Sequence, residues 1–201
     1  MAQEGRTWPS IIDRPFLHIR QDRKAEGSPF LAGPVGTRML ITFDLDDTLI
    51  CWQPEIPAEP VKLPWYHKWF RTEPLRHGTV DLFKKLRDCG WQIGIYTTSH
   101  RKSKYIKKLF NLHGLKLDLV INQNRHEKII ENLKEKRKPS KLPNWVNSQL
   151  HIDDSEGVLI EGKRFNFRAL VVDPLDNNWT NKVLAESICV TRMLEQGSYR
   201  A

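Results

Sequence analysis

The sequence predicts an α/β fold in which a parallel sheet is covered by helices on both faces. Its 201 residues, 39% hydrophobic and 28% charged, suit one buried core. From residue 39 onward, short apolar runs alternate with segments of helical spacing, which is typical of strands joined by crossover helices. Polar residues directly follow several of these runs, at the place where a parallel sheet has its ligand crevice. These three observations together predict a Rossmann-like, three-layer arrangement.

Five short apolar runs predict the strands. They cover residues 39–43, 91–96, 117–121, 150–152 and 169–172. Each run is shorter than a typical helix, and runs of this length and composition are typical of buried strands.

Apolar residues spaced three or four apart predict helices between the strands. They cover residues 80–89, 105–113, 129–133 and 179–191. Gly90 and Gly114 follow the first two segments and are natural helix stops. Asn177 or Asn178 is a candidate N-cap for the last helix.

Two segments show no sustained pattern. Residues 1–38 are rich in Pro, Gly and charge, and we expect a partly irregular N-terminal extension before a domain at 39–201. Residues 50–77 contain five prolines, which disfavour long helices. We therefore expect a compact insert, or flap, at this point of the domain.

The formal net charge of +8 is concentrated in one part of the chain. Residues 100–141 hold 13 basic and four acidic residues. This excess suggests an anionic partner, although it equally fits a role in solubility alone.

No apolar run is long enough to span a membrane, and the N-terminus lacks a signal-peptide pattern. The three cysteines are too few and too widely spaced to suggest a disulfide framework or a zinc site. We therefore expect a cytoplasmic protein with no membrane partner.

Pairs of carboxylates follow two of the predicted strands. Asp44 and Asp46 follow the first strand, and Asp153 and Asp154 follow the fourth. Carboxylates that would otherwise repel one another suggest a hard divalent cation, and Mg²⁺ prefers oxygen ligands and often bridges to a substrate phosphate. A carboxylate can also act as a nucleophile or as a general acid and base.

Hydroxyl and basic side chains lie at the other predicted strand ends. Thr97 and Thr98 follow the second strand, with Arg101 just beyond them. Lys138 and Lys141 precede the fourth strand, and either is a candidate site lysine, with Lys138 favoured. A hydroxyl and a lysine can hold phosphoryl oxygens while charge shifts during transfer. The segments together predict a phosphoryl-transfer site, with Thr98 and Arg101 as candidate substrate-binding residues.

Four motifs in this order resemble those of the haloacid dehalogenase-like (HAD) phosphohydrolases. They are DLDDTL at 44–49, Thr97 after IGIY, KPS at 138–140 and the aspartate pair after LHI. The resemblance covers residues 39–175 and implies a sheet of order 5-4-1-2-3. The short insert looks like the minimal-cap branch, in which a flap replaces the cap domain and some members act on phosphoproteins or nucleic-acid ends.

The resemblance also implies roles for the catalytic residues. Asp44 would be the nucleophile, and Asp46 would be the general acid and base. Thr97 would bind the transferring phosphoryl group, and Lys138 would neutralise charge on Asp44 and that group, with Lys141 as the alternative.

A magnesium site is implied in the same way. Asp44 and Asp154 would bind Mg²⁺ directly, Asp46 would contribute its backbone carbonyl, and Asp153 would act in the outer shell or as a further ligand.

The implied function is a Mg²⁺-dependent phosphatase that acts through an aspartyl-phosphate intermediate. Its open site would suit a bulky or polyanionic phosphorylated substrate, such as a nucleotide, a nucleic-acid end or a phosphoprotein. Three alternatives stay open: a regulatory protein that kept the fold without turnover, a nucleic-acid-binding protein, and a phosphotransferase.

Overall fold

The computed structural model describes residues 39–60, 72–131 and 133–199. The predicted N-terminal extension and the middle of the predicted flap, residues 61–71, lie outside the described residues.

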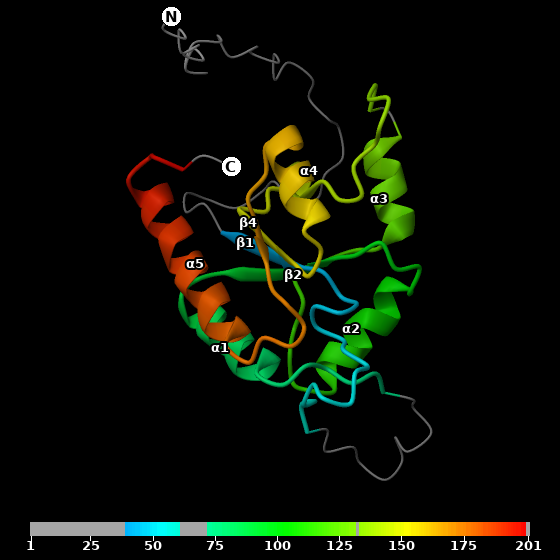
Figure 1. Cartoon of the computed structure of the whole chain (residues 1–201), viewed down its shortest axis with the longest axis vertical. Helices are drawn as coiled ribbons and strands as arrows, with labels where there is room; N and C mark the ends of the chain where they lie inside the picture. The colour runs from blue at the N-terminus through cyan, green and yellow to red at the C-terminus, as the bar shows by residue number, and fades with distance from the viewer. Residues whose placement is uncertain (1–38, 61–71, 132, 200–201) are drawn as a thin grey trace, which may run out of the picture. The chain divides into compact units, whose positions relative to one another are not determined.

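A five-stranded parallel sheet forms the centre of the domain (Figure 1). Its strands are β1 (Leu40–Phe43), β2 (Gln92–Tyr96), β3 (Leu119–Ile121), β4 (Leu150–Asp153) and β5 (Ala169–Val171). The strand order β3-β2-β1-β4-β5 is the predicted order 5-4-1-2-3 seen from the other edge, so the prediction is confirmed. Phe43 at the end of β1 pairs with Ile95 of β2 and Ile152 of β4. This register aligns the carboxyl ends of the three central strands.

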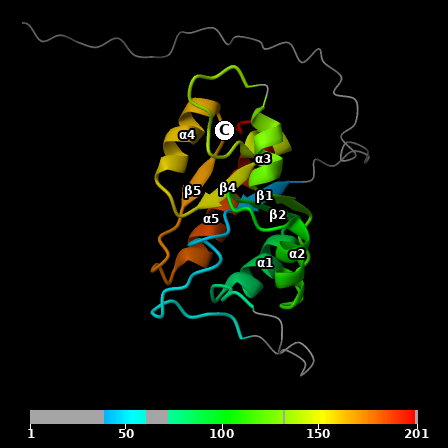
Figure 2. The same cartoon turned by 90° about the vertical axis from the view of Figure 1, so that its right-hand side faces the viewer.

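Helices cover both faces of the sheet (Figure 2). They are α1 (Thr79–Asp88), α2 (Ser103–Asn111), α3 (Gln123–Ile130), α4 (Gly157–Phe165) and α5 (Trp179–Glu195). Helices α1, α2 and α5 lie on one face, and α3 and α4 lie on the other. The basic stretch 100–141 therefore spans helices on opposite faces. Within the described ranges, no helix has the length and apolar character needed to cross a membrane.

Two helices differ from the sequence predictions. Helix α3 begins at Gln123 rather than at residue 129, because the side chain of Asn122 accepts a hydrogen bond from the backbone N–H of Arg125 and caps the helix. Helix α4 was not predicted, since its apolar residues do not mark its buried face: Val158 is buried, whereas Ile160 is 71% exposed.

Aromatic packing fixes the central strand against the helices. The ring of Phe43 lies 5.0 Å from that of Phe83 in α1, and Phe83 stacks on Phe110 of α2 at 5.9 Å between ring centroids. All three side chains are buried. Because such a core is close-packed, it holds the end of β1, and with it the residues that follow, in one position.

The described ends of the insert pair with each other beside the sheet. Ile50 forms an antiparallel bridge with Leu75, and Ala58 forms one with Arg76. Arg76 is 3% exposed and donates hydrogen bonds to the backbone carbonyls of Asp173 and Asp176. These contacts fasten the base of the insert to the loop between β5 and α5.

Candidate active site

Three aspartates meet at the carboxyl ends of the neighbouring strands β1 and β4. Asp44 directly follows β1, and its backbone N–H donates to the carbonyl of Ile152 in β4 at 2.8 Å. Asp153 ends β4, and Asp154 follows it. One carboxylate oxygen from each of Asp44, Asp153 and Asp154 lies within 4.8 Å of the others. The parallel pairing of β1 and β4 thus brings together carboxylates that are far apart in the sequence.

The lysine at this cluster is Lys141. Its Nζ lies 3.1 Å from Asp44 Oδ2 and 2.5 Å from Asp153 Oδ2, and the residue is 6% exposed. Burial alone would lower the pKa of Lys141, but the charges of Asp44 and Asp153 outweigh burial and raise it. Lys141 therefore keeps its positive charge between the two carboxylates.

The structure places Lys138, the favoured site lysine, away from the aspartates. Lys138 is exposed, and its Nζ donates to the backbone carbonyl of Glu131 at 3.4 Å. Between the two lysines, Ser140 donates from its backbone N–H and its hydroxyl to Glu161 of α4. This anchor fixes the segment so that Lys141, and not Lys138, lies against the aspartates.

Asp153 already has partners on both of its oxygens. Oδ1 accepts from the backbone N–H of Ser155, and Oδ2 is in contact with Lys141 and with Nε2 of His151. Burial opposes ionisation of Asp153, but the hydrogen bond from His151 and the charge of Lys141 outweigh burial and lower its pKa. These contacts favour an outer-shell role for Asp153, one of the two roles that the resemblance implies.

Asp44 and Asp154 have capacity left for a cation. Asp44 Oδ1 is buried and has no hydrogen-bond partner among the residues that the structure describes. Asp154 Oδ1 accepts from the hydroxyl of Thr48 at 2.9 Å. Burial and the nearby charge of Asp153 raise the pKa of both carboxyls, so their negative charge is not fully compensated by the protein. An oxygen-rich site with excess negative charge fits Mg²⁺.

The carboxylate of Asp46 lies outside this cluster of three. Its Oδ2 accepts from Arg101 Nη1 at 2.8 Å, and the side chain is 44% exposed. Arg101 also pairs with Glu73, so its guanidinium faces protein carboxylates. The predicted backbone-carbonyl role of Asp46 toward a metal stays a prediction.

The two threonines after β2 have different surroundings. Thr97 is buried, and its Oγ1 accepts from the backbone N–H of Ser99 at 3.1 Å. Because that bond uses the oxygen as an acceptor, the hydroxyl hydrogen can still donate to a phosphoryl oxygen. Thr98 is exposed, and its role in substrate binding stays a prediction.

A buried hydrogen-bond chain supports the segment that carries Lys141. The hydroxyl of Tyr96 lies 2.8 Å from Nδ1 of His126, and Nε2 of His126 lies 3.1 Å from the carbonyl of Pro139. Burial lowers the pKa of His126, which favours the neutral ring. One ring nitrogen then accepts from the tyrosine and the other donates to the carbonyl. The sequence pattern did not reveal this contact, because a lone histidine in a helical segment carries no positional signal.

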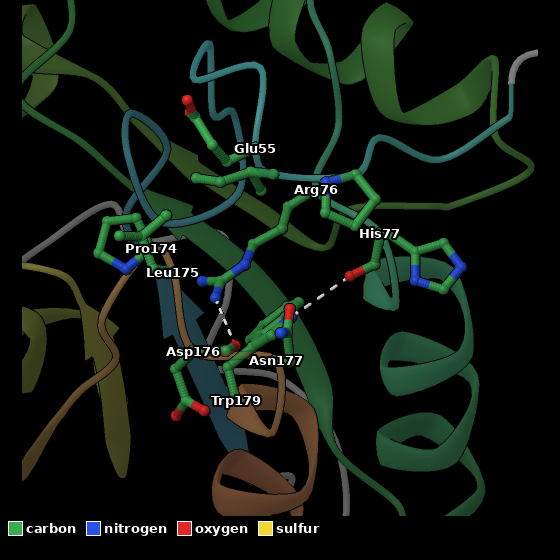
Figure 3. Close-up of a pocket in the computed structure, with 10 residues that line it drawn as sticks. Glu55, Arg76, His77, Pro174, Leu175, Asp176, Asn177 and Trp179 are labelled. Carbon is green, nitrogen blue, oxygen red and sulfur yellow. Dashed lines mark hydrogen bonds between the residues drawn. The ribbon is translucent and has the colours of Figure 1, made fainter.

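A separate pocket contains none of the residues of the candidate active site (Figure 3). It is lined by the base of the insert and the loop before α5, including Glu55, His77 and Leu175. The guanidinium of Arg76 is bonded to backbone carbonyls there and lies 4.5 Å from the ring centroid of Trp179. Because the buried cation has protein partners, this pocket is best explained as structural.

Comparisons with known proteins leave the functional argument to the structure itself. No family model matches the sequence, and no curated protein matches it. Among solved structures, the chain is similar to "a predicted HAD-like family hydrolase from Porphyromonas gingivalis", with 12% sequence identity and a TM-score of 0.39. The match covers 75% of this chain and 98% of that one, but it is too distant to carry a role over to any residue. The strand order and the adjacency of Asp44 and Asp154 follow from the structure alone, and they are the arrangement that the HAD-like motifs imply.

Proposed function

We propose that the protein is a Mg²⁺-dependent phosphomonoester hydrolase of the HAD superfamily that acts through an aspartyl-phosphate on Asp44. The observation that carries the proposal is the buried Asp44, which is paired with Lys141 on Oδ2 and lacks a described partner on Oδ1. Asp154 lies beside it and supplies a second carboxylate. A bound Mg²⁺ would be held by Asp44 and Asp154 and would neutralise charge on the phosphoryl oxygens.

In the first half of the reaction, a carboxylate oxygen of Asp44 attacks the phosphorus. The bond between phosphorus and the ester oxygen breaks, and Asp46 donates a proton to the departing alcohol. Lys141 stabilises the negative charge that Asp44 and the phosphoryl oxygens share, and Thr97 donates a hydrogen bond to one of those oxygens. The products are the free alcohol and the aspartyl-phosphate.

In the second half, water attacks the phosphorus of the aspartyl-phosphate. Asp46, now a carboxylate, accepts a proton from that water, and the bond between phosphorus and Asp44 breaks. Inorganic phosphate leaves, Asp44 is regenerated as a carboxylate, and Asp46 is protonated again for the next cycle. Atoms and protons therefore balance with water as the co-substrate.

The proposed substrate is a bulky or polyanionic phosphomonoester, such as a nucleotide, a nucleic-acid end or a phosphoprotein. The exposed Thr98 beside the site and the basic stretch 100–141 support this choice. A panel of phosphorylated metabolites, nucleotides, 5′- and 3′-phosphorylated oligonucleotides and phosphopeptides, assayed with Mg²⁺ for phosphate release, tests it. Release of phosphate only from phosphomonoesters of small, uncharged alcohols would argue against a polyanionic substrate.

Magnesium is expected to stabilise the fold, in a manner that depends on Asp154. A ligand that binds only the folded state contributes about 2.7 kcal/mol at 100 times its dissociation constant. Thermal unfolding at increasing Mg²⁺ should therefore show a rising midpoint for the wild type and little rise for Asp154→Asn. Asp47→Asn is the control, because Asp47 lies in the loop after β1, three positions from Asp44, but is exposed and bonded to Gln53.

The magnesium effect should also grow with pH. Because the pKa values of Asp44 and Asp154 are raised in the folded state, ionising them lowers the stability of the metal-free fold as pH rises through those values. Mg²⁺ relieves that cost, so the rise in midpoint should be larger at neutral pH than under mildly acidic conditions. An equal shift in Asp154→Asn and the wild type would contradict the assigned site.

A further inference from the structure

The carboxylate of Asp46 is bonded to an arginine that also binds side chains from other segments of the domain. Arg101, in the loop before α2, donates from Nη1 to Asp46 Oδ2 at 2.8 Å and to the hydroxyl of Ser99 at 2.8 Å. The other side of the same guanidinium meets Glu73 of the insert, with Nε to Oε1 at 2.9 Å and Nη2 to Oε2 at 2.7 Å. Tyr105 of α2 donates from its hydroxyl to Glu73 Oε1 at 2.8 Å. The expected acid/base residue is thus joined to the insert through one arginine.

The geometry leaves Arg101 little freedom to move. An arginine has five N–H donors in a rigid plane, and four of them are used by Asp46, Ser99 and Glu73. The fork-shaped pairing with Glu73 fixes the plane of the guanidinium, and Glu73 is only 13% exposed. The backbone carbonyl of Arg101 also accepts from the side chain of Asn122. Turning the guanidinium away from Asp46 would break the paired bonds to Glu73.

The charges around Arg101 also bear on the predicted substrate contact. Glu73 alone balances the charge of the guanidinium, and Asp46 adds a second carboxyl group on its other side. A guanidinium whose charge is already balanced is a poor site for a phosphate. The arrangement therefore suits the placement of a carboxylate better than the binding of an anionic substrate.

We propose that Arg101 is a positioning residue for the acid/base Asp46, and that Glu73 holds Arg101 in place for this task. The inference rests on the proposed function, since it assigns Asp46 its proton-transfer role. In that role, Arg101 holds the carboxyl group of Asp46 in one orientation through the bond from Nη1 to Oδ2. Loss of Arg101 should therefore impair proton transfer and leave nucleophilic attack by Asp44 largely intact.

Two substrates with different leaving groups separate proton transfer from the rest of the reaction. A nitrophenolate departs without needing a proton, whereas an alkoxide needs one. For Arg101→Ala we expect kcat/KM to fall by about 10- to 100-fold with an alkyl phosphate, which is part of the roughly 10²- to 10⁴-fold contribution of general acid catalysis, and by less than about threefold with p-nitrophenyl phosphate. Glu73→Gln should show the same selectivity in weaker form. Arg87→Ala, which breaks an arginine–aspartate pair away from the site, is the matched control and should affect neither substrate.

A double-mutant cycle shows whether Arg101 acts through Asp46. In the Asp46→Asn background, Arg101→Ala should cause little further loss with the alkyl phosphate, because the group it positions is gone. Equal losses with both substrates, or losses that multiply with those of Asp46→Asn, would overturn the proposal and indicate direct substrate binding by Arg101.

The four proteins of this cycle are the wild type, the two single variants and the double variant. They can also be compared by chemical unfolding, which needs no activity. Arg101→Ala should destabilise the fold less in the Asp46→Asn background than in the wild type, because the pair is already broken there. Absence of this coupling would overturn the inference even in an active enzyme. Coupling in a wild type that hydrolyses no phosphomonoester would instead count against the proposed function while supporting the contact between Arg101 and Asp46.

Discussion

Asp44→Asn is expected to lower phosphatase turnover by a factor of about 10⁴ or more, in the range seen when an enzyme loses its nucleophile. The amide has nearly the same shape as the carboxylate, but it is neutral and a poor nucleophile toward phosphorus. Steady-state phosphate release from a phosphomonoester with Mg²⁺ measures the effect. Turnover within tenfold of the wild type would show that Asp44 does not form the intermediate.

The fold should survive this substitution, so loss of activity can be read as loss of chemistry. Burial raises the pKa of Asp44, so its charge is unfavourable in the metal-free fold, and removing it relieves that cost. Lys141 keeps Asp153 as its partner. Circular dichroism and the unfolding midpoint without Mg²⁺ serve as controls, and a midpoint well below that of the wild type would mean that the inactivity reflects misfolding.

Lys141→Met is expected to reduce kcat by about 10²- to 10³-fold, the loss typical of removing one group that stabilises transition-state charge. Methionine keeps much of the aliphatic stem but leaves Asp44 and Asp153 without their shared cation. Breaking one side of a buried ion pair costs about 3–5 kcal/mol of stability, so the unfolding midpoint without Mg²⁺ should fall as well. Mg²⁺ should restore part of that stability, because it neutralises Asp44.

Lys138→Met is the matched control for this prediction. Lys138 lies three positions earlier and is exposed, and within the described ranges its Nζ donates to a backbone carbonyl. Lys138→Met should leave kcat within about twofold of the wild type. It should leave the free energy of unfolding within about 0.5 kcal/mol, as is usual for surface positions. The reverse pattern, with Lys138→Met inactive and Lys141→Met active, would return the catalytic assignment to Lys138.

The central part of the fold could be predicted because its signals are local. Short apolar runs gave the strands, and helical spacing gave α1, α2 and α5 close to their observed bounds. Asp44 and Asp154 directly follow neighbouring strands, so their meeting depended only on the strand order that the motifs imply. Helix α4 was not predicted, because Ile160 is apolar but exposed and therefore obscures the helical periodicity.

The finer parts of the site depend on contacts that sequence patterns do not record. Lys138 and Lys141 lie in one basic run, and the bonds from Ser140 to Glu161 determine which lysine is buried. Arg101 was recognisable as a residue just beyond a strand end, but its partner Glu73 lies 28 positions earlier, within the proline-rich segment 50–77, which has no regular pattern. Such long-range pairs follow from packing and could not be read from spacing.

Trapping the covalent intermediate tests the central proposal most directly. Asp46→Asn should slow the attack of water, so rapid acid quenching during turnover of ³²P-labelled p-nitrophenyl phosphate with Mg²⁺ should capture labelled protein. Borohydride reduction of the acyl phosphate, followed by peptide mass spectrometry, identifies the modified residue. The proposal predicts an adduct on Asp44 that is sensitive to hydroxylamine and absent from Asp44→Asn. Wild-type turnover with inversion of configuration at phosphorus and no labelled protein would contradict it, since that result indicates direct attack by water.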